Sequence, residues 1–228
     1  MMPLADQVLL SVAYLGPVQY YTKFLLYDGI WMETEENYQK QSYRNRCNIL
    51  SANGQMALTI PVTKDQPRVK TRDLRIDNTL EWQKNHWTSI ESAYSSSPFF
   101  EFLADDFAPF YNRPYHFLLD FIWDLQQVVL ETLDLDVPVN RTHAYVRNTD
   151  ETTDDLRDAI HPKRRMQRPD PLFTPAFYHQ VFHERYGFIP NLSIIDLLFN
   201  EGPNAENILK QSLARHTRRD NNARQNST

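Results

Sequence analysis

The stretch VLLSVA, residues 8–13, decides how the chain is expected to fold. It is a short and nearly continuous apolar run rather than a strict alternation of apolar and polar residues. A strand that is buried on both faces has this pattern. The run therefore predicts a strand at the centre of a small sheet.

A hairpin is predicted outward from this strand, where RCNIL (46–50) and QMALTIPV (55–62) flank the tetrapeptide SANG. Asn53-Gly54 supplies the positive φ angles that a tight hairpin turn requires. Further short strands are expected at 30–33, 74–76 and 139–146. The hairpin is expected at the edge of the sheet.

Helical periodicity dominates the middle of the chain. Apolar residues recur at helical spacing over 80–95, SSSP (95–98) interrupts them, and a short second helix is expected from residue 99. The strongest pattern follows Pro114 and extends to residue 134. We expect an α/β fold in which helices at 80–110 and 114–134 cover the sheet, with α+β as the alternative.

The rest of the chain is expected to be less regular. An acidic run at 150–158, a basic run at 161–168 and three prolines predict a surface excursion. A helix is expected at 178–186 and another at 194–200, capped by Ser193 and closed at Gly202. Residues 1–209 are predicted to form one domain, and the polar residues 210–228 a disordered tail.

Composition excludes several classes of function. The chain has five glycines and no Gly-rich phosphate loop, and its net charge of −5 argues against a nucleic-acid partner. A single cysteine leaves no internal disulfide, and no apolar stretch approaches a membrane span. These features predict a cytoplasmic protein without a membrane span, a metal or a cofactor.

The densest group of polar residues is NYQKQSYRNRCN, residues 37–48. If the segment runs into a strand, Arg44 and Arg46 share one face and offer two guanidinium groups to a carboxylate or phosphate. The alternative is an edge strand whose charges discourage aggregation. The other candidate substrate-binding residues of this segment are Lys40, Tyr43 and Asn45.

Two single residues have both a chemical and a structural interpretation. His86 could act as a general base, or it could be a hydrogen-bonded histidine in an aromatic core. Cys47 could be a nucleophile, or a small buried residue of the hairpin. His179 and His183 are four residues apart but have no evident third ligand, so no metal site is predicted.

Five passages taken together resemble the WbqC-like family, and in order they cover most of residues 8–203. They are YLGPVQYYTKFLLYD (14–28), ENYQKQSYRNRCNI (36–49), NGQMALTIPV (53–62), WQKNHWTSIESAYSSSPFFE (82–101) and GFIPNLSIIDLLFNEGP (187–203). Each passage alone is only modestly specific for the family, but the five passages together, in this order and at these separations, are specific for it. Many members carry a His-Gln-Pro element where this chain reads SVAYLGP.

The resemblance implies a role in surface-polysaccharide (O-antigen) biosynthesis, with a small-molecule substrate of the sugar-phosphate or nucleotide-sugar class. One hypothesis is an enzyme that transfers an aminoacyl or acyl group to a sugar, with His86 as the base. The other is a non-catalytic module that binds a nucleotide-sugar, a glycan intermediate or a partner protein. The resemblance also singles out the polar residues of PNLSIID as groups presented to a pocket, namely Asn191, Ser193 and Asp196.

Overall fold

The computed structural model describes residues 5–63, 68–163 and 166–214. Its strands are β1 (Gln7–Ser11), β2 (Gly29–Glu33), β3 (Arg46–Ser51), β4 (Gly54–Thr59), β5 (Val62–Thr63), β6 (Arg75–Ile76), β7 (Val139–Arg141) and β8 (Thr153–Asp155). Its α-helices are α1 (Val18–Thr22), α2 (Trp82–Tyr94), α3 (Phe100–Asn112), α4 (Leu118–Thr132), α5 (His183–Tyr186), α6 (Ile194–Glu201) and α7 (Ala205–Gln211). Short 3-10 helices are η1 (Lys23–Leu25), η2 (Thr71–Asp73) and η4 (Gly202–Asn204).

Four parallel strands form the central sheet in the order β7-β2-β1-β8. Strand β1 lies inside it, with Gln7 opposite Gly29 on one side and Thr153 on the other. The central strand predicted from VLLSVA and the α/β class are both confirmed. The acidic run at 150–158 was expected to be a surface excursion, but part of it is β8.

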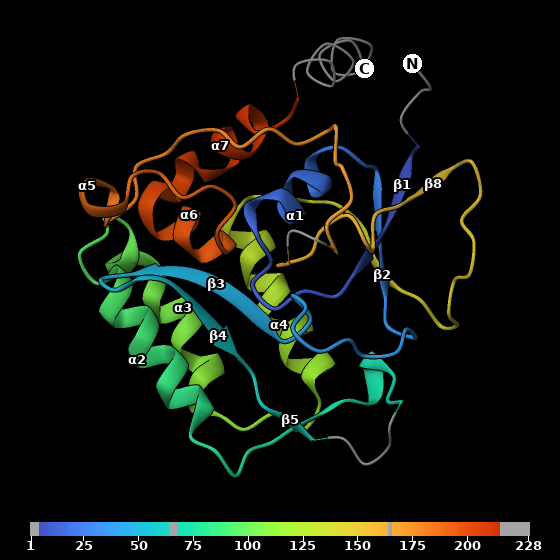
Figure 1. Cartoon of the computed structure of the whole chain (residues 1–228), viewed down its shortest axis with the longest axis horizontal. Coiled ribbons are helices and arrows are strands. Elements are labelled where there is room, and N and C mark those ends of the chain that lie inside the picture. Colours follow the sequence, from blue (N-terminus) through green and yellow to red (C-terminus); the bar gives the residue numbers. More distant parts are fainter. Residues whose placement is uncertain (1–4, 64–67, 164–165, 215–228) are drawn as a thin grey trace.

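The two faces of this sheet have different covers. One face is fully buried in the main hydrophobic core, and its side chains are Val8, Leu10, Ile30 and Met32. The other face carries Leu9 and Trp31, over which the loop between β7 and β8 passes. Figure 1 shows the helices on one side of β1 and β2 and this loop, in yellow, on the other.

The hairpin is confirmed, and its turn places Gly54 at a φ of +99°. It forms a two-stranded sheet of its own rather than the edge of the central sheet. The reason is that β3 is bound by other elements: the Ser193 amide donates to the Asn48 carbonyl, and α2 packs on the strand. A second antiparallel pair joins β5 and β6.

Helices α2, α3 and α4 lie where periodicity predicted them, although α3 continues to Asn112 and is longer than expected. The helix expected at 178–186 shortens to the four residues of α5. Tyr178 and Gln180 instead turn inward and hydrogen-bond to Asp196, which requires an irregular backbone before α5.

The C-terminal segment stays folded beyond residue 209, where the polar tail was expected to begin. Helix α7 continues to Gln211, Ser212 and Leu213 are buried, and Leu213 forms a β-bridge with Phe173. The remainder of the expected tail, residues 215–228, lies outside the described residues.

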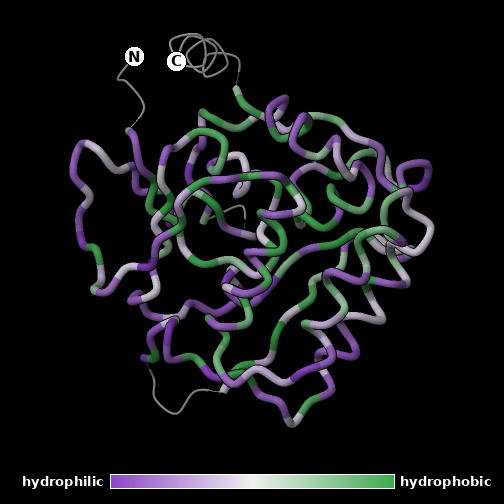
Figure 2. Tube along the Cα trace, turned by 180° about the vertical axis from the view of Figure 1, so that it is seen from behind, coloured by the Kyte–Doolittle hydropathy of each residue, from purple (hydrophilic) through white to green (hydrophobic). Residues whose placement is uncertain are grey.

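Hydrophobic segments run through the middle of the molecule, and hydrophilic segments lie toward its outside (Figure 2). Tyr14, Tyr21 and Tyr94 are among the largest fully buried side chains. Over the residues that the structure describes, none of the helices is both long and apolar enough to cross a membrane.

Candidate functional site

Polar side chains gather at the carboxyl end of the parallel sheet. Ser11 ends β1 and lies opposite Glu33, which ends β2, while Asp155 ends β8. Open parallel sheets bind their ligands outside the carboxyl ends of the strands, because the loops that follow the strands converge there. A ligand site is therefore expected at this end of the sheet.

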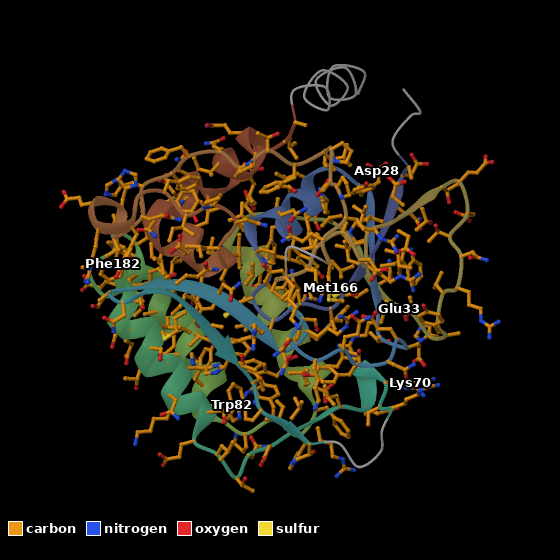
Figure 3. All side chains as sticks on the ribbon, in the orientation of Figure 1. Asp28, Glu33, Lys70, Trp82, Met166 and Phe182 are labelled. Atoms are coloured by element: carbon orange, nitrogen blue, oxygen red, sulfur yellow. The ribbon has the colours of Figure 1, made fainter. Side chains whose placement is uncertain are left out.

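Glu33 is completely buried and is the centre of this group. It accepts hydrogen bonds from Thr142 Oγ1 at 2.7 Å, the Val146 amide at 3.0 Å and Arg157 Nη1 at 3.0 Å. Arg157 also donates to both carboxylate oxygens of Asp155, and these bonds raise the pKa of the guanidinium. The carboxylate of Glu33, a residue labelled in Figure 3, thus fixes the loop that follows β7.

Arg44 reaches the same end of the sheet from the segment before β3. It is 4% exposed and forms a two-pronged ion pair with Glu36, with Nε–Oε1 at 2.8 Å and Nη2–Oε2 at 2.5 Å. Its Nη2 also donates to Ser11 Oγ at 2.9 Å. The fork that was expected to take a substrate oxygen is occupied by a carboxylate of the chain itself.

A fourth acidic residue, Glu35, lies next to this pair and is bound by Arg72 and by Lys70, which is labelled in Figure 3. Burial raises its pKa, but the two cations outweigh that effect and lower the pKa overall. Each of these cations therefore has a carboxylate partner. The carboxyl end of the sheet is rich in charge but close to electrical balance.

A small cavity of about 10 Å³ lies between β1 and the segment after β8. Tyr43, Arg44 and Arg157 line it together with Ser11. A volume of this size holds about one water molecule. Two of the predicted residues, Tyr43 and Arg44, therefore meet at one point, but that point is too small for a substrate.

A larger pocket of about 320 Å³ lies on the face of the sheet away from the helices. Its floor is Leu9 and Trp31, and its rim comes from the loop between β7 and β8. The rim's polar side chains include Thr142, His143, Asn148, Thr149 and Asp150, together with Thr153 at the start of β8. Arg157 connects the pocket with the carboxyl end, because its Nη1 donates to the Val146 carbonyl of the rim at 2.8 Å.

The other predicted residues of segment 37–48 are dispersed. Lys40 is exposed in a turn, and Asn45 is buried with its amide donating to the Ile60 carbonyl at 2.7 Å. Arg46 lies on the hairpin and donates to Thr59 Oγ1 at 3.1 Å. Arg44 precedes β3, so the strand alternation that was expected to align it with Arg46 does not extend to it.

His86 lies in an aromatic core and is 6% exposed. Its Nδ1 is 3.0 Å from the Tyr14 hydroxyl, which also contacts Tyr111, and the Trp82 ring meets the imidazole edge-on at 5.2 Å. Burial lowers the pKa of His86 to about 4, so the ring is neutral at pH 7. This environment fits a hydrogen-bonded histidine in an aromatic core better than a general base, and His86 lines neither the cavity nor the pocket.

Cys47 is likewise in the core. Burial raises the pKa of its thiol to about 12, which disfavours the reactive thiolate.

The three polar residues of PNLSIID hold the chain together. Asn191 exchanges hydrogen bonds with Gln19, and Ser193 Oγ donates to the Leu15 carbonyl at 2.8 Å. Asp196 is fully buried and accepts from the hydroxyls of Tyr94 at 2.8 Å and Tyr178 at 2.7 Å. Burial raises the pKa of Asp196 to about 6 despite these donors.

Sequence reasoning did not select Trp31, Glu33 or Arg157. Trp31 and Glu33 are two apart in a predicted strand, so alternation places them on one face, which was a usable signal. Arg157 gave no signal, because it lies in a run that was expected to be on the surface. Within the described part of the chain, no three His, Cys, Asp or Glu side chains come close enough to hold a metal ion.

The fold and this site define an open α/β protein with a polar carboxyl end and a pocket on one sheet face. The model of the WbqC-like protein family matches residues 13–167, and the chain belongs to that family. An uncharacterized protein of Mycobacterium tuberculosis (strain ATCC 25618 / H37Rv), Rv1507c, is 26% identical over 219 residues, which are 86% of this chain and 91% of that protein. No solved structure matches significantly.

Proposed function

We propose that the chain binds a sugar intermediate of surface-polysaccharide biosynthesis, of the sugar-phosphate or nucleotide-sugar class. The observation that carries this proposal is the pocket of about 320 Å³, which joins an aromatic floor to a polar rim beside the carboxyl end of the sheet. The resemblance to the family supplies the biosynthetic context. The geometry of the pocket supports a binding function.

The balance of charge favours the sugar over its phosphate as the part that is recognised. Arg157 and Arg44 are already paired with carboxylates, so a phosphate would have to compete with Asp155, Glu33 or Glu36. Sugar hydroxyls need only hydrogen-bond donors and acceptors, which the rim offers. We therefore expect the phosphate or nucleotide to extend toward solvent.

A second candidate function is transfer of an acyl or aminoacyl group to the bound sugar. One observation favours it: the imidazole of His143 lies on the rim of the pocket. A histidine at that position could take a proton from an attacking hydroxyl or amine. His86 is less suitable, because an acceptor could reach its ring only if the aromatic core opened.

Binding is tested by thermal shift and calorimetry against UDP-, GDP- and dTDP-hexoses, with the matching nucleotides as controls. At least one nucleotide-sugar should raise the melting temperature and do so more than its nucleotide alone. A Lys40→Ala variant should respond as the wild type does, because Lys40 lies outside the pocket. If no sugar derivative shifts the melting temperature, the proposed function is wrong.

Catalysis is tested with the variant His143→Gln. It should keep the affinity for the nucleotide-sugar but lose any transfer of a radiolabelled glycyl or other acyl group to it from an activated donor such as a thioester, which releases its thiol. Equal transfer by the variant and the wild type would exclude His143 as the base. If the wild type binds the nucleotide-sugar but transfers no acyl group to it, the transferase proposal is wrong and the binding function alone stands.

A further inference from the structure

We infer that the pocket under the β7–β8 loop is a subsite for one pyranose ring, whose apolar face stacks on the indole of Trp31. This inference rests on the proposed function and names the part of the ligand that the pocket takes.

The floor of the pocket is a fixed aromatic plane. Trp31 is half-buried on β2, and its Nε1 donates to Gln7 Oε1 on β1 at 2.8 Å. Gln7 lies opposite Gly29 in the register of β1 and β2, so it is the neighbour of Trp31 across the two strands. This hydrogen bond restricts the orientation of the indole before a ligand binds, which reduces the entropic cost of binding.

The rim of the pocket offers both hydrogen-bond donors and acceptors. Asn148 carries an amide, Thr149 and Thr153 carry hydroxyls, and Asp150 carries a carboxylate. Hydrogen bonds from Thr152 hold Asp150 Oδ1 and lower the pKa of that carboxyl, so the group is ionised and accepts. A ligand that fits this pocket has an apolar face and a hydroxylated edge, and a pyranose ring has both.

The size and charge of the pocket argue against other ligands. Its volume of about 320 Å³ is at the lower end of ligand pockets, which run from about 300 to 1,000 Å³, so it takes one ring rather than a whole nucleotide-sugar. A purely apolar ligand would leave the rim groups without partners, which is costly. An anion would face Asp150 while Arg157 stays paired with Asp155 and Glu33.

The loop that forms the rim is anchored from the carboxyl end of the sheet. Glu33 accepts from the Val146 amide, and Arg157 donates to the Val146 carbonyl. Thr142 is tied to the same Glu33 carboxylate at 2.7 Å. The rim is therefore held in place by the same buried residues that fill the carboxyl end, which gives that charged group a positioning role.

The test compares Trp31→Leu with Trp123→Leu as a matched control. Trp123 is also half-buried, but it lies on α4 beneath Arg141, 3.8 Å from the guanidinium carbon, and outside this pocket. The probes are UDP-N-acetylglucosamine, UDP-glucose, UDP-galactose and GDP-mannose, with UDP and GDP alone as references. Affinity is measured by calorimetry, and folding of each variant by circular dichroism.

Trp31→Leu should weaken binding of the nucleotide-sugar at least tenfold and leave any binding of the nucleotide alone unchanged. Trp123→Leu should bind within twofold of the wild type and still show a change in tryptophan fluorescence on binding. If Trp31→Leu fails to fold, Asn148→Ala serves instead, because Asn148 is exposed, and it should weaken binding about fivefold.

Two outcomes overturn the inference, and they differ in what else they affect. If the wild type binds a nucleotide-sugar and a folded Trp31→Leu or Asn148→Ala variant binds it equally well, the subsite is wrong but the proposed function stands. If the wild type binds none of the probes, both are wrong.

Discussion

Two groups of polar residues in this protein differ in what they do. In the segments 37–48 and 190–196, the polar side chains of Arg44, Asn45, Ser193 and Asp196 are buried and hydrogen-bonded inside the fold, whereas the exposed ones, such as Lys40, line no pocket described above. The loop between β7 and β8 is less conspicuous in sequence, yet its polar side chains surround an open pocket beside Trp31. A high density of polar residues thus indicates a buried network as readily as a binding site.

The difference follows from where each segment lies in the chain. Arg44 lies just before the hairpin and donates a hydrogen bond to Ser11 of the central sheet. Asp196 on α6 accepts a hydrogen bond from Tyr94 on α2, which is far away in sequence. Buried polar groups between such elements need hydrogen-bond partners within the protein, because water is excluded from them. The loop after β7 has solvent on one side, so its polar groups are available to a ligand.

The largest effect should come from breaking the buried pair with Glu36→Ala. Arg44 would be left buried without its partner, which costs about 3–5 kcal/mol of unfolding free energy in comparable pairs. Urea denaturation measures the loss. The double variant Glu36→Leu, Arg44→Met should regain most of it, and a single variant within about 1 kcal/mol of the wild type would mean that the pair is not structural.

His86→Ala should cost about 3 kcal/mol of stability, because the aromatic core loses a ring and Tyr14 loses a hydrogen-bond partner. Thermal and urea unfolding would show this. His86→Gln, which keeps a polar group, should cost less. An unchanged melting temperature together with lost transfer activity would instead place His86 in a catalytic site.

The two buried titratable residues should respond to pH in opposite directions. The folded state holds the His86 proton less tightly than the unfolded chain, so stability is lost as pH falls from 6.5 to about 4. The folded state holds the Asp196 proton more tightly, so stability is gained as pH falls through about 6 toward 3.8. Each contribution is about 3 kcal/mol, so they nearly cancel.

Variants separate the two contributions. Asp196→Asn should lose stability more steeply than the wild type between pH 6.5 and 4, whereas His86→Gln should become more stable on acidification over the same range. Urea unfolding at half-unit pH steps measures both slopes. Parallel pH profiles for the three proteins would contradict the assigned burial effects.

The smallest effect is expected for Lys40→Ala, because Lys40 lies in the polar segment 37–48 but its side chain is exposed. Its unfolding free energy should stay within about 0.5 kcal/mol of the wild type, and its sugar affinity should not change. A clear loss of sugar affinity would show that segment 37–48 contributes to binding. It would contradict the difference drawn between this segment and the β7–β8 loop.

Much of the fold could be predicted from local patterns. The apolar run of β1, the Asn53-Gly54 turn and the periodicity of α4 each correspond to an observed element. Strand β8 could not be predicted, because TDD at 153–155 has no apolar character and gains its place from pairing with β1 and from the hydrogen bond that Tyr27 donates to Asp154. The separate position of the hairpin depends on the contact between Ser193 and Asn48, which are distant in sequence.

The candidate site was harder to predict than the fold. Tyr43 and Arg44 were predicted from the sequence, and both line the small cavity. The sequence does not show that Arg44 is already bound by Glu36 and Ser11, because these contacts form only in the folded chain. Trp31 was overlooked because a tryptophan in a short strand is expected to pack into a core. Only the packing in three dimensions shows that its face of β2 is covered by a loop rather than by helices.

The parallel pairing of β1 with β8 has a consequence for biosynthesis. A chain that is still being synthesised can pair β1 with β2 early, but residues 153–155 leave the ribosome much later. Until then one edge of an apolar strand remains open, and such edges recruit other chains. Parallel pairing over long sequence separation is also slow. We expect nascent chains and fragments that end before β8 to depend on chaperones and to aggregate without them.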